Sequence, residues 1–279
     1  MIRNIFTVDV EEYYCVTAFE KVIRRESWDR LPSRVEETVP YLLDALAAAG
    51  AKGTFFILGW VAERHGALVR RIAETGNEVA SHGYSHTRIF EQDPEVFRAD
   101  VRKGRKILED LIGGGVFGYR APSFSVTRDT LWALDVLAEE RFLYDSSIYP
   151  VYRGSYGIHD APRSIHKVRL AGGSSMFEVP PACITTPVGR IPVGGGAYLR
   201  WAPLAFTVWA IGRITRRDGI PFVFYIHPWE LDPDHPPVDG AGWVTSKRHY
   251  HGIPRNRAKV EHLLERFRFG TILETLREK

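Results

Sequence analysis

The stretch VEETVPYLLDALAAAGAKGTFFI, residues 35–57, joins an amphipathic segment to a short apolar run and decides the fold. Val35–Ala49 is predicted as a helix, with Ser33 as its candidate cap. Gly53–Ile57 is predicted as a strand, and so is the apolar run Ile2–Val8 that precedes the helix. Strands that alternate with crossover helices are typical of α/β proteins with a parallel sheet.

The same alternation continues along most of the chain. It predicts one α/β domain over residues 1–279, with polar motifs just after several strands, and chemistry at strand ends is typical of barrels. Further helices are predicted at Trp60–Thr75, Asp93–Leu111 and Arg128–Glu140, and further strands at Glu78–Ser81, Phe142–Asp145 and Pro221–Ile226.

Two regions interrupt the alternation. Residues 151–200 place glycines and prolines between short β-like pieces, which predicts an insertion with β-hairpins. Residues 230–279 form a C-terminal extension, in which Glu230–Arg257 is rich in Pro, Gly, His and Asp and is predicted as a long loop. The end of this extension, Ala258–Phe267 and Thr271–Arg277, is predicted to be helical.

The composition excludes several classes of protein. The chain has 15 Phe, 12 Tyr and 7 Trp in 279 residues and a formal net charge of +3, so it can bury enough surface to fold, which excludes disorder. Its 37 Lys and Arg form no long basic run, so we expect no nucleic-acid partner. The apolar stretch Trp201–Ile214 falls short of the roughly 20 residues that span a bilayer, so no integral membrane segment is expected.

The cysteines and the N-terminus predict a cytoplasmic location. Cys15 and Cys183 show no metal-type Cys-x-x-Cys spacing, and a chain of this length needs no disulfide framework, which fits a reducing compartment. The first residues, Met1-Ile2-Arg3-Asn4, lead directly into the first predicted strand without the apolar core of a secretory signal.

Acids and histidines near strand ends are candidates for a metal site. TVDVEE, residues 7–12, places Asp9 and Glu11 on the same side of an extended chain, although a solvated strand end explains them equally well. SHGYSH, residues 81–86, holds His82 and His86 four residues apart; such pairs are as often surface or hydrogen-bonded histidines. One carboxylate and two imidazoles would hold Zn²⁺ or a similar ion and leave a position open for water.

Three further polar motifs follow predicted strands. They are RAPS at 120–123, DSS at 145–147 and YIHP at 225–228. Each has an ordinary structural explanation: a surface loop at Arg120, a cap at Asp145 and a buried structural histidine at His227. Their common placement after strands favours one shared site.

Taken together, the motifs resemble a known family. TVDVEE, SHGYSH, RAPSFS, DSSIYP and FYIHPWE occur in the order and approximate spacing of the polysaccharide deacetylases, carbohydrate esterase family four. The resemblance covers about Asn4 to Glu230. Ile191–Arg200, His227–Pro233 and Arg255–Leu276 resemble the subgroup encoded beside bacterial exopolysaccharide and exosortase genes.

This resemblance implies a distorted (β/α) barrel of the NodB-homology type and a metal-dependent hydrolase. The hydrolase would remove N-acetyl groups from N-acetylhexosamine units of a polysaccharide or its oligosaccharide precursor, in exopolysaccharide biosynthesis. By position in the motifs, Asp9 matches the general base, Arg120 the residue that tethers it, and His227 the general acid. The matching metal ligands are Glu11, His82 and His86, for zinc or, as alternatives, cobalt, manganese or nickel.

The expected substrate contacts come from the same motifs. Pro122 and Ser123 follow Arg120 along the groove wall, and aromatic residues beside the motifs are candidates to stack on sugar rings. The full predicted set is Pro122, Ser123, Asp145, Tyr84 and Trp229.

The sequence also departs from the family pattern. Val10 separates Asp9 from Glu11, where most members have adjacent aspartates, and Glu12 is an alternative ligand. Ile148 stands where many members have an Asp that orients the catalytic histidine, so Asp145 is a candidate replacement. Two other functions therefore stay open: hydrolysis of another non-peptide C–N bond, as in the allantoinase-like branch, and a catalytically silent carbohydrate-binding scaffold.

Overall fold

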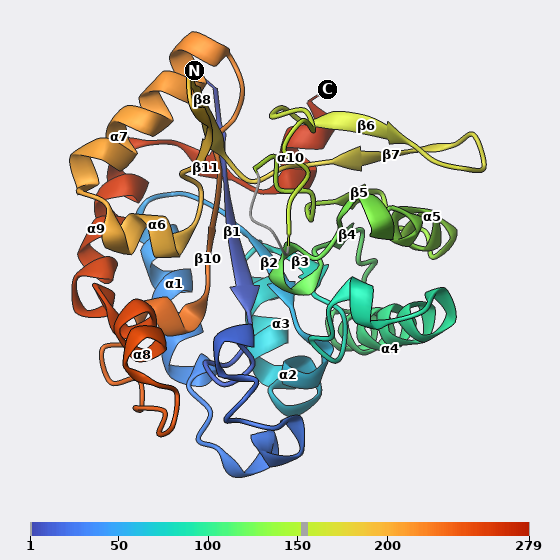
Figure 1. Cartoon of the computed structure of the whole chain (residues 1–279), viewed down its shortest axis with the longest axis horizontal. Coiled ribbons are helices and arrows are strands. Elements are labelled where there is room, and N and C mark those ends of the chain that lie inside the picture. The colour runs from blue at the N-terminus through green and yellow to red at the C-terminus, as the bar shows by residue number, and fades with distance from the viewer. Residues whose placement is uncertain (1, 152–155, 279) are drawn as a thin grey trace.

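The computed structural model describes residues 2–151 and 156–278. Among these residues, nine strands form one curled, mostly parallel sheet in the order β10-β1-β2-β3-β4-β5-β7-β6, with β11 paired to β1 (Figure 1). This is the predicted distorted (β/α) barrel. The strands of this sheet are β1 (Asn4–Val10), β2 (Thr54–Ile57), β3 (Glu78–Ser81), β4 (Gly118–Tyr119), β5 (Tyr144–Asp145), β6 (His166–Arg169), β7 (Ser175–Glu178), β10 (Val223–Ile226) and β11 (Phe269–Gly270).

Strand β1 lies between β10 and β2 in the sheet. All seven of its residues are buried, and it pairs in parallel with β10 through Ile5–Val8 and with β2 through Thr7–Val10. Both faces of such a strand are covered, which explains why Ile5, Phe6, Val8 and Val10 are apolar. The pairing brings the start of the chain beside residues 223–226. Motifs that are far apart in the sequence therefore lie together at the carboxyl ends of these parallel strands.

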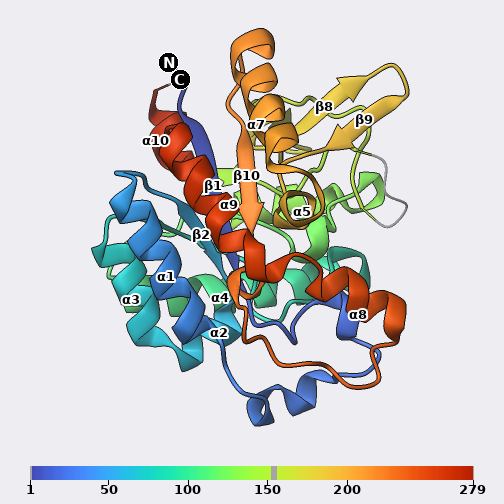
Figure 2. The same ribbon diagram turned by 90° about the vertical axis from the view of Figure 1, so that its left-hand side faces the viewer.

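The helices lie outside the sheet, and α1 packs against α9 (Figure 2). Both termini lie at the end of the molecule opposite the tip of β1 (Figures 1 and 2). No helix within residues 2–151 and 156–278 is long and apolar enough to cross a membrane. The helices are α1 (Val35–Ala48), α2 (Gly59–Arg64), α3 (Gly66–Glu74), α4 (Pro94–Ile112), α5 (Trp132–Glu139), α6 (Gly196–Trp201), α7 (Leu204–Arg213), α8 (Trp243–Tyr250), α9 (Ile253–Arg266) and α10 (Ile272–Arg277).

The predicted insertion contains two hairpins. β6 and β7 pair antiparallel, and β7 also pairs in parallel with β5, so this hairpin extends the main sheet. A separate hairpin joins β8 (Cys183–Thr186) to β9 (Gly189–Pro192). The hairpins predicted within 151–200 are therefore confirmed.

Two helix predictions are wrong in detail. The helix predicted over Trp60–Thr75 divides into α2 and α3 at His65, whose backbone (φ −122°, ψ 44°) leaves the helical region. The loop predicted over Glu230–Arg257 contains α8, and α9 begins at Ile253 because Gly252 adopts a left-handed conformation and Pro254 fits the first turn of a helix.

The cap of α1 also differs from the prediction. Ser33 does not cap this helix; its hydroxyl instead donates to Glu12. The Glu12 carboxylate accepts hydrogen bonds from the backbone N–H groups of Arg34 (2.9 Å) and Val35 (3.4 Å). A carboxylate is favoured at a helix N-terminus, where unpaired N–H groups and the helix dipole meet. The Glu12 carboxylate therefore binds the start of α1 and is not an alternative metal ligand.

Candidate active site at the ends of β1, β3 and β10

Glu11, His82 and His86 meet just beyond the carboxyl ends of β1 and β3. One ligand atom from each side chain lies within 4.8 Å of the other two. Oε2 of Glu11 is 2.5 Å from Nε2 of His86 and 3.9 Å from Nε2 of His82, yet it is buried and has no hydrogen bond of good geometry with any described residue. A buried carboxylate oxygen without a hydrogen bond, facing two imidazole nitrogens, fits a divalent-cation site.

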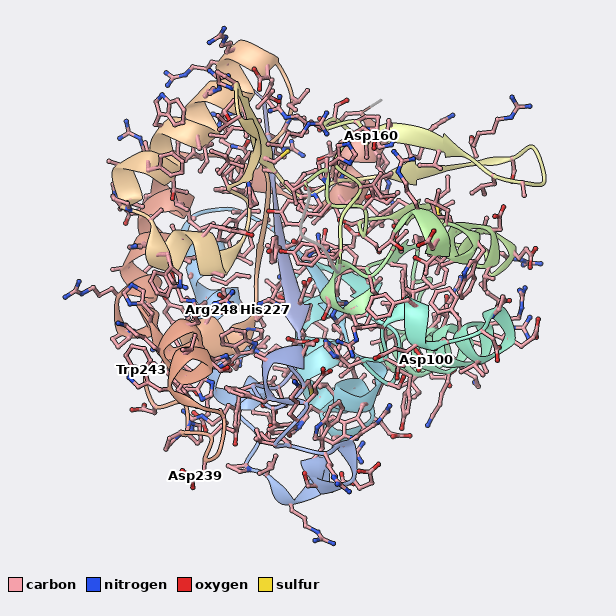
Figure 3. The ribbon with its side chains drawn as sticks, viewed as in Figure 1. Asp100, Asp160, His227, Asp239, Trp243 and Arg248 are labelled. Atoms are coloured by element: carbon pink, nitrogen blue, oxygen red, sulfur yellow. The ribbon has the colours of Figure 1, made fainter. Side chains whose placement is uncertain are left out.

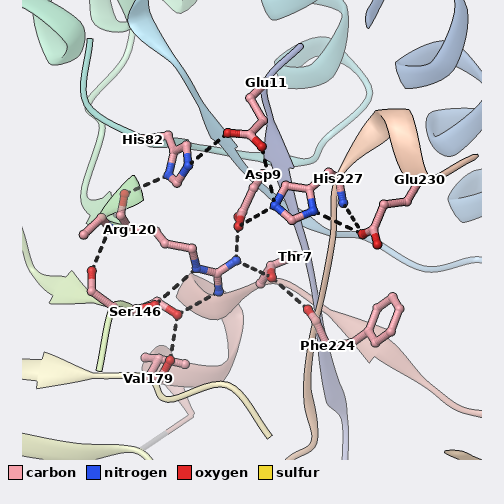
Figure 4. Close-up of polar contacts among 12 residues, drawn as sticks. Thr7, Asp9, Glu11, His82, Arg120, Ser146, Val179, Phe224, His227 and Glu230 are labelled. Atoms are coloured by element: carbon pink, nitrogen blue, oxygen red, sulfur yellow. Dashed lines mark hydrogen bonds and ion pairs between the residues drawn. The ribbon is translucent and has the colours of Figure 1, made fainter. Parts of the chain in front are cut away.

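The protonation states of these ligands suit a metal. Burial raises the pKa of Glu11, but the electrostatic interactions of its carboxylate with His86 and His227 outweigh burial and lower this pKa to about 2. Burial lowers the pKa of His82 to about 4. Nδ1 of His82 lies 2.8 Å from the carbonyl oxygen of Arg120 and donates to it, so Nε2 carries the lone pair and faces Glu11 (Figure 4). Metal ions bind ionised carboxylates and neutral imidazoles.

The loop between the two histidines is held by Asp100 on α4. Its carboxylate accepts hydrogen bonds from the backbone N–H groups of Tyr84 (2.8 Å) and Ser85 (3.1 Å). Gly83 has φ +73°, and a Cβ there would lie 2.9 Å from the Asp100 carboxylate. The glycine thus permits the tight turn that brings both imidazoles to one point.

Arg120 holds the Asp9 carboxylate in place. Its guanidinium is fully buried and donates to Oδ1 of Asp9 at 2.6 Å and to Oγ1 of Thr7 at 2.8 Å. It also donates to the hydroxyl (2.8 Å) and the carbonyl (3.2 Å) of Ser146 (Figure 4). These bonds fix the guanidinium on all sides, so Oδ1 of Asp9 is held in place and Oδ2 remains to face His227 at 3.9 Å.

His227 follows β10 and is oriented by Glu230. Nδ1 of His227 lies 3.1 Å from Oε2 of Glu230, and Nε2 lies 3.7 Å from Oε1 of Glu11. Burial lowers the pKa of His227, but the hydrogen bond to Glu230 and the nearby negative charges outweigh burial and raise this pKa to about 9. The imidazole is therefore held with Nε2 toward the two carboxylates.

Glu230 is in turn held by Arg200, which completes a buried chain of polar contacts. Nε of Arg200 donates to Oε1 of Glu230 at 2.9 Å, and its NH1 donates to the carbonyl oxygens of His249 (2.6 Å) and His251 (2.8 Å). Burial raises the pKa of Glu230, but the charge of Arg200 and the hydrogen bond to His227 lower it overall. The carboxylate thus stays ionised beside the imidazole.

A cavity of about 340 Å³ opens over these groups. Asp9, Glu11, His82, His86 and His227 all line it, so the structure brings together the predicted base, metal ligands and acid. Of the predicted substrate contacts, Ser123 and Trp229 line the cavity.

Three predicted substrate contacts lie elsewhere. Pro122 is buried in a short 3-10 turn and does not line the cavity. Tyr84 donates to Glu63 at 2.9 Å, outside the cavity lining. Asp145 is fully buried and accepts a hydrogen bond from Ser147 at 2.6 Å, so it does not orient His227.

Sequence reasoning missed the roles of Glu230, Arg200 and Asp100. Glu230 belongs to the motif FYIHPWE, and its spacing from His227 across Pro228 was a usable signal, because a 3-10 turn brings residues three apart together. Arg200 and Asp100 reach the site only through tertiary contacts, which no local pattern indicates.

Two family matches divide the chain. Residues 26–138 match the polysaccharide deacetylase family, and residues 146–277 match a domain of unknown function, DUF3473. A peptidoglycan-N-acetylglucosamine deacetylase from Bacillus cereus is 33% identical over 100 residues, which are 36% of this chain and 36% of that protein. The match therefore spans about a third of the length of that relative.

Solved structures share the fold over most of the chain. A Mycobacterium smegmatis protein, provisionally assigned as a polysaccharide deacetylase, superposes with a TM-score of 0.62 at 20% identity, covering 99% of this chain and 90% of that one. The PuuE allantoinase superposes with a TM-score of 0.56 at 17% identity, covering 86% of this chain and 71% of that one. These likenesses show the fold, and residues 26–138, which carry His82, His86 and Arg120, match the polysaccharide deacetylase family.

Proposed function

We propose that this protein is a metal-dependent N-deacetylase that acts on N-acetylhexosamine units of a polysaccharide or its oligosaccharide precursor. One observation carries the proposal: the Glu11-His82-His86 cluster shares a cavity with an arginine-held carboxylate and a carboxylate-held histidine. Amide hydrolysis needs a base for the attacking water, a stabiliser for the developing oxyanion and an acid for the departing nitrogen.

Residues of this chain can meet each of these requirements. Asp9, fixed by Arg120, takes the proton of the attacking water through its free oxygen. His227, fixed by Glu230, donates the proton that the amine needs in order to leave. A divalent cation held by Glu11, His82 and His86 would supply Lewis acidity toward water and the acetyl carbonyl. Zinc suits two imidazoles and a carboxylate, and cobalt, manganese and nickel are the alternatives.

We further propose a role in exopolysaccharide biosynthesis and a cytoplasmic location. The first part rests on the resemblance of Ile191–Arg200 and His227–Pro233 to the exopolysaccharide-associated subgroup. The second is supported by Cys15 and Cys183, which are both buried and unpaired, as expected in a reducing compartment.

The test combines metal analysis with acetate release. The purified protein and its His82→Ala variant are analysed for bound metal, and acetate release from N-acetylglucosamine oligomers is measured on the same samples. His262→Ala is the matched control, because His262 is exposed on α9, away from the cavity. We expect one bound metal per chain and acetate release in the wild type and in His262→Ala, and neither in His82→Ala.

The other outcomes assign other functions. Bound metal without acetate release from any N-acetylated glycan would overturn the deacetylase and direct the search to other C–N bonds. No metal after reconstitution, with glycan binding retained, would establish a carbohydrate-binding scaffold instead.

A further inference from the structure

A second cavity, of about 810 Å³, lies beside the catalytic one. Four residues, Ala18, Tyr156, Tyr225 and His249, line both cavities, so the two form one continuous depression. Volumes of about 300–1,000 Å³ are typical of ligand sites. The catalytic cavity alone is at the low end of this range, and the second cavity gives room for more of a glycan chain.

The second cavity presents aromatic side chains. Tyr198 and Trp201 of α6 line it, and Trp201 is 51% exposed. One face of the Trp201 indole stacks on His251, with ring centroids 4.0 Å apart and planes at 22°. This contact holds the indole in place and leaves its other face for a ligand. Flat aromatic rings with a polar edge suit contact with the apolar faces of sugars.

The charge of the second cavity is positive. Arg200 and Arg248 line it, and no aspartate or glutamate does so among the described residues. The charge of Arg200 is matched by Glu230 at 2.9 Å, whereas the side chain of exposed Arg248 on α8 has no ion pair or hydrogen bond within the described part of the chain. Figure 3 labels Arg248, which lines the second cavity, and His227, which lines the catalytic cavity.

His249, at the junction, presents a hydrogen-bond acceptor. Nδ1 of His235 lies 2.9 Å from the carbonyl oxygen of Pro236 and donates to it, so Nε2 of His235 carries a lone pair. Nε2 of His249 lies 2.6 Å from that nitrogen and must be the donor, which leaves Nδ1 of His249 as an acceptor. Burial lowers the pKa of both histidines, which keeps both rings neutral. A hydroxyl or amide N–H of a sugar could donate to this nitrogen.

We propose that the second cavity binds the sugar unit next to the N-acetylhexosamine in the glycan chain, and that this neighbouring unit is acidic, with its carboxylate paired to Arg248. The guanidinium offers two parallel N–H donors that match a carboxylate. Trp201 and Tyr198 contact the ring of the acidic sugar. The inference rests on the proposed function only in placing the N-acetylhexosamine in the catalytic cavity.

The test compares two tetrasaccharides of equal length. A hyaluronan tetrasaccharide alternates N-acetylglucosamine with glucuronic acid, and N-acetylchitotetraose contains N-acetylglucosamine alone. Calorimetric titration of the metal-loaded protein should give about three- to tenfold tighter binding of the hyaluronan probe, as expected for a partly exposed ion pair with good geometry.

Two variants locate the effect. Arg248→Gln should abolish the preference for the acidic probe, and Trp201→Ala should weaken the binding of both probes. Lys247→Gln is the matched control, because it removes one positive charge from the same helix at a residue that does not line the cavity. Equal affinity of the wild type for both probes, or an equal effect of Lys247→Gln and Arg248→Gln, would overturn the inference.

Acetate release, measured on the same samples, separates this inference from the proposed function. A charge preference that depends on Arg248, without acetate release, would overturn only the deacetylase activity. Acetate release without a charge preference would overturn only the acidic-sugar site.

Discussion

Replacing Glu230 with Gln tests how the proton donor is held. The Glu230 carboxylate lies 3.1 Å from Nδ1 of His227 and 2.9 Å from Nε of Arg200, and all three side chains are largely buried. A hydrogen bond to a charged group contributes about 1.5–3 kcal/mol. Because each 1.36 kcal/mol corresponds to a tenfold change in rate, loss of the charge predicts a fall in kcat of about 10- to 150-fold. KM should change little, since Glu230 does not line the catalytic cavity.

The assay compares two leaving groups. Acetate release from an N-acetylglucosamine oligomer requires protonation of the departing amine, whereas p-nitrophenyl acetate releases a phenolate that leaves without a proton. Glu230→Gln should therefore lose most of its activity on the amide and retain most of its activity on the ester. Metal content and melting temperature are measured on the same preparations, so that a folding defect caused by the unpaired Arg200 is recognised.

An equal loss on both substrates, with metal content and folding intact, would refute this reasoning. It would mean that Glu230 supports the site as a whole and does not act through the acid His227.

Three further predictions follow from the buried groups. Arg120→Gln leaves the Asp9 carboxylate buried without its cation. Urea denaturation should therefore show a loss of about 3–5 kcal/mol in the free energy of unfolding, and acetate release should be lost as well. An unchanged unfolding curve would contradict this prediction. Burial lowers the pKa of His235 to about 4 and that of His249 further still, so below about pH 6.5 the unfolded chain binds more protons than the folded one. The free energy of unfolding should then decrease as the pH falls from about 6.5 toward 4, by up to about 1.4 kcal/mol per pH unit for each histidine. In a variant with Gln at both positions, urea titrations should show a smaller difference in this free energy between pH 7 and pH 5. Removal of metal by a chelator should abolish acetate release and lower the melting temperature, and added zinc should restore both; a chelated protein with full activity would exclude the metal.

The sequence predicted those features that depend on local patterns. The strand over Glu78–Ser81 has the predicted bounds, and alternating apolar and amphipathic segments predicted the parallel sheet correctly. Because parallel strands end at one edge, motifs placed at or just after the ends of strands were sufficient to bring Asp9, His82 and His227 to one cavity. These inferences need only periodicity and the geometry of a parallel sheet.

The features that sequence did not predict depend on contacts between distant segments. Glu12 caps α1 from across a loop, and Arg200 reaches Glu230 from α6. The break at His65 accompanies contacts of its ring with Ser33 and Glu36. No local pattern encodes such partners, because a residue's own neighbours do not reveal which other segment will lie beside it.

The position of β1 between β2 and β10 has a consequence for synthesis on the ribosome. The metal ligands, Glu11 to His86, emerge early, but β10 and the acid His227 emerge only when most of the chain has been made. Until then the nascent β1 has an unpaired edge of the kind that promotes aggregation. The segment 26–138, expressed by itself, would lack β1 and β10 altogether, so the boundaries of the sequence family do not mark a unit that can fold alone.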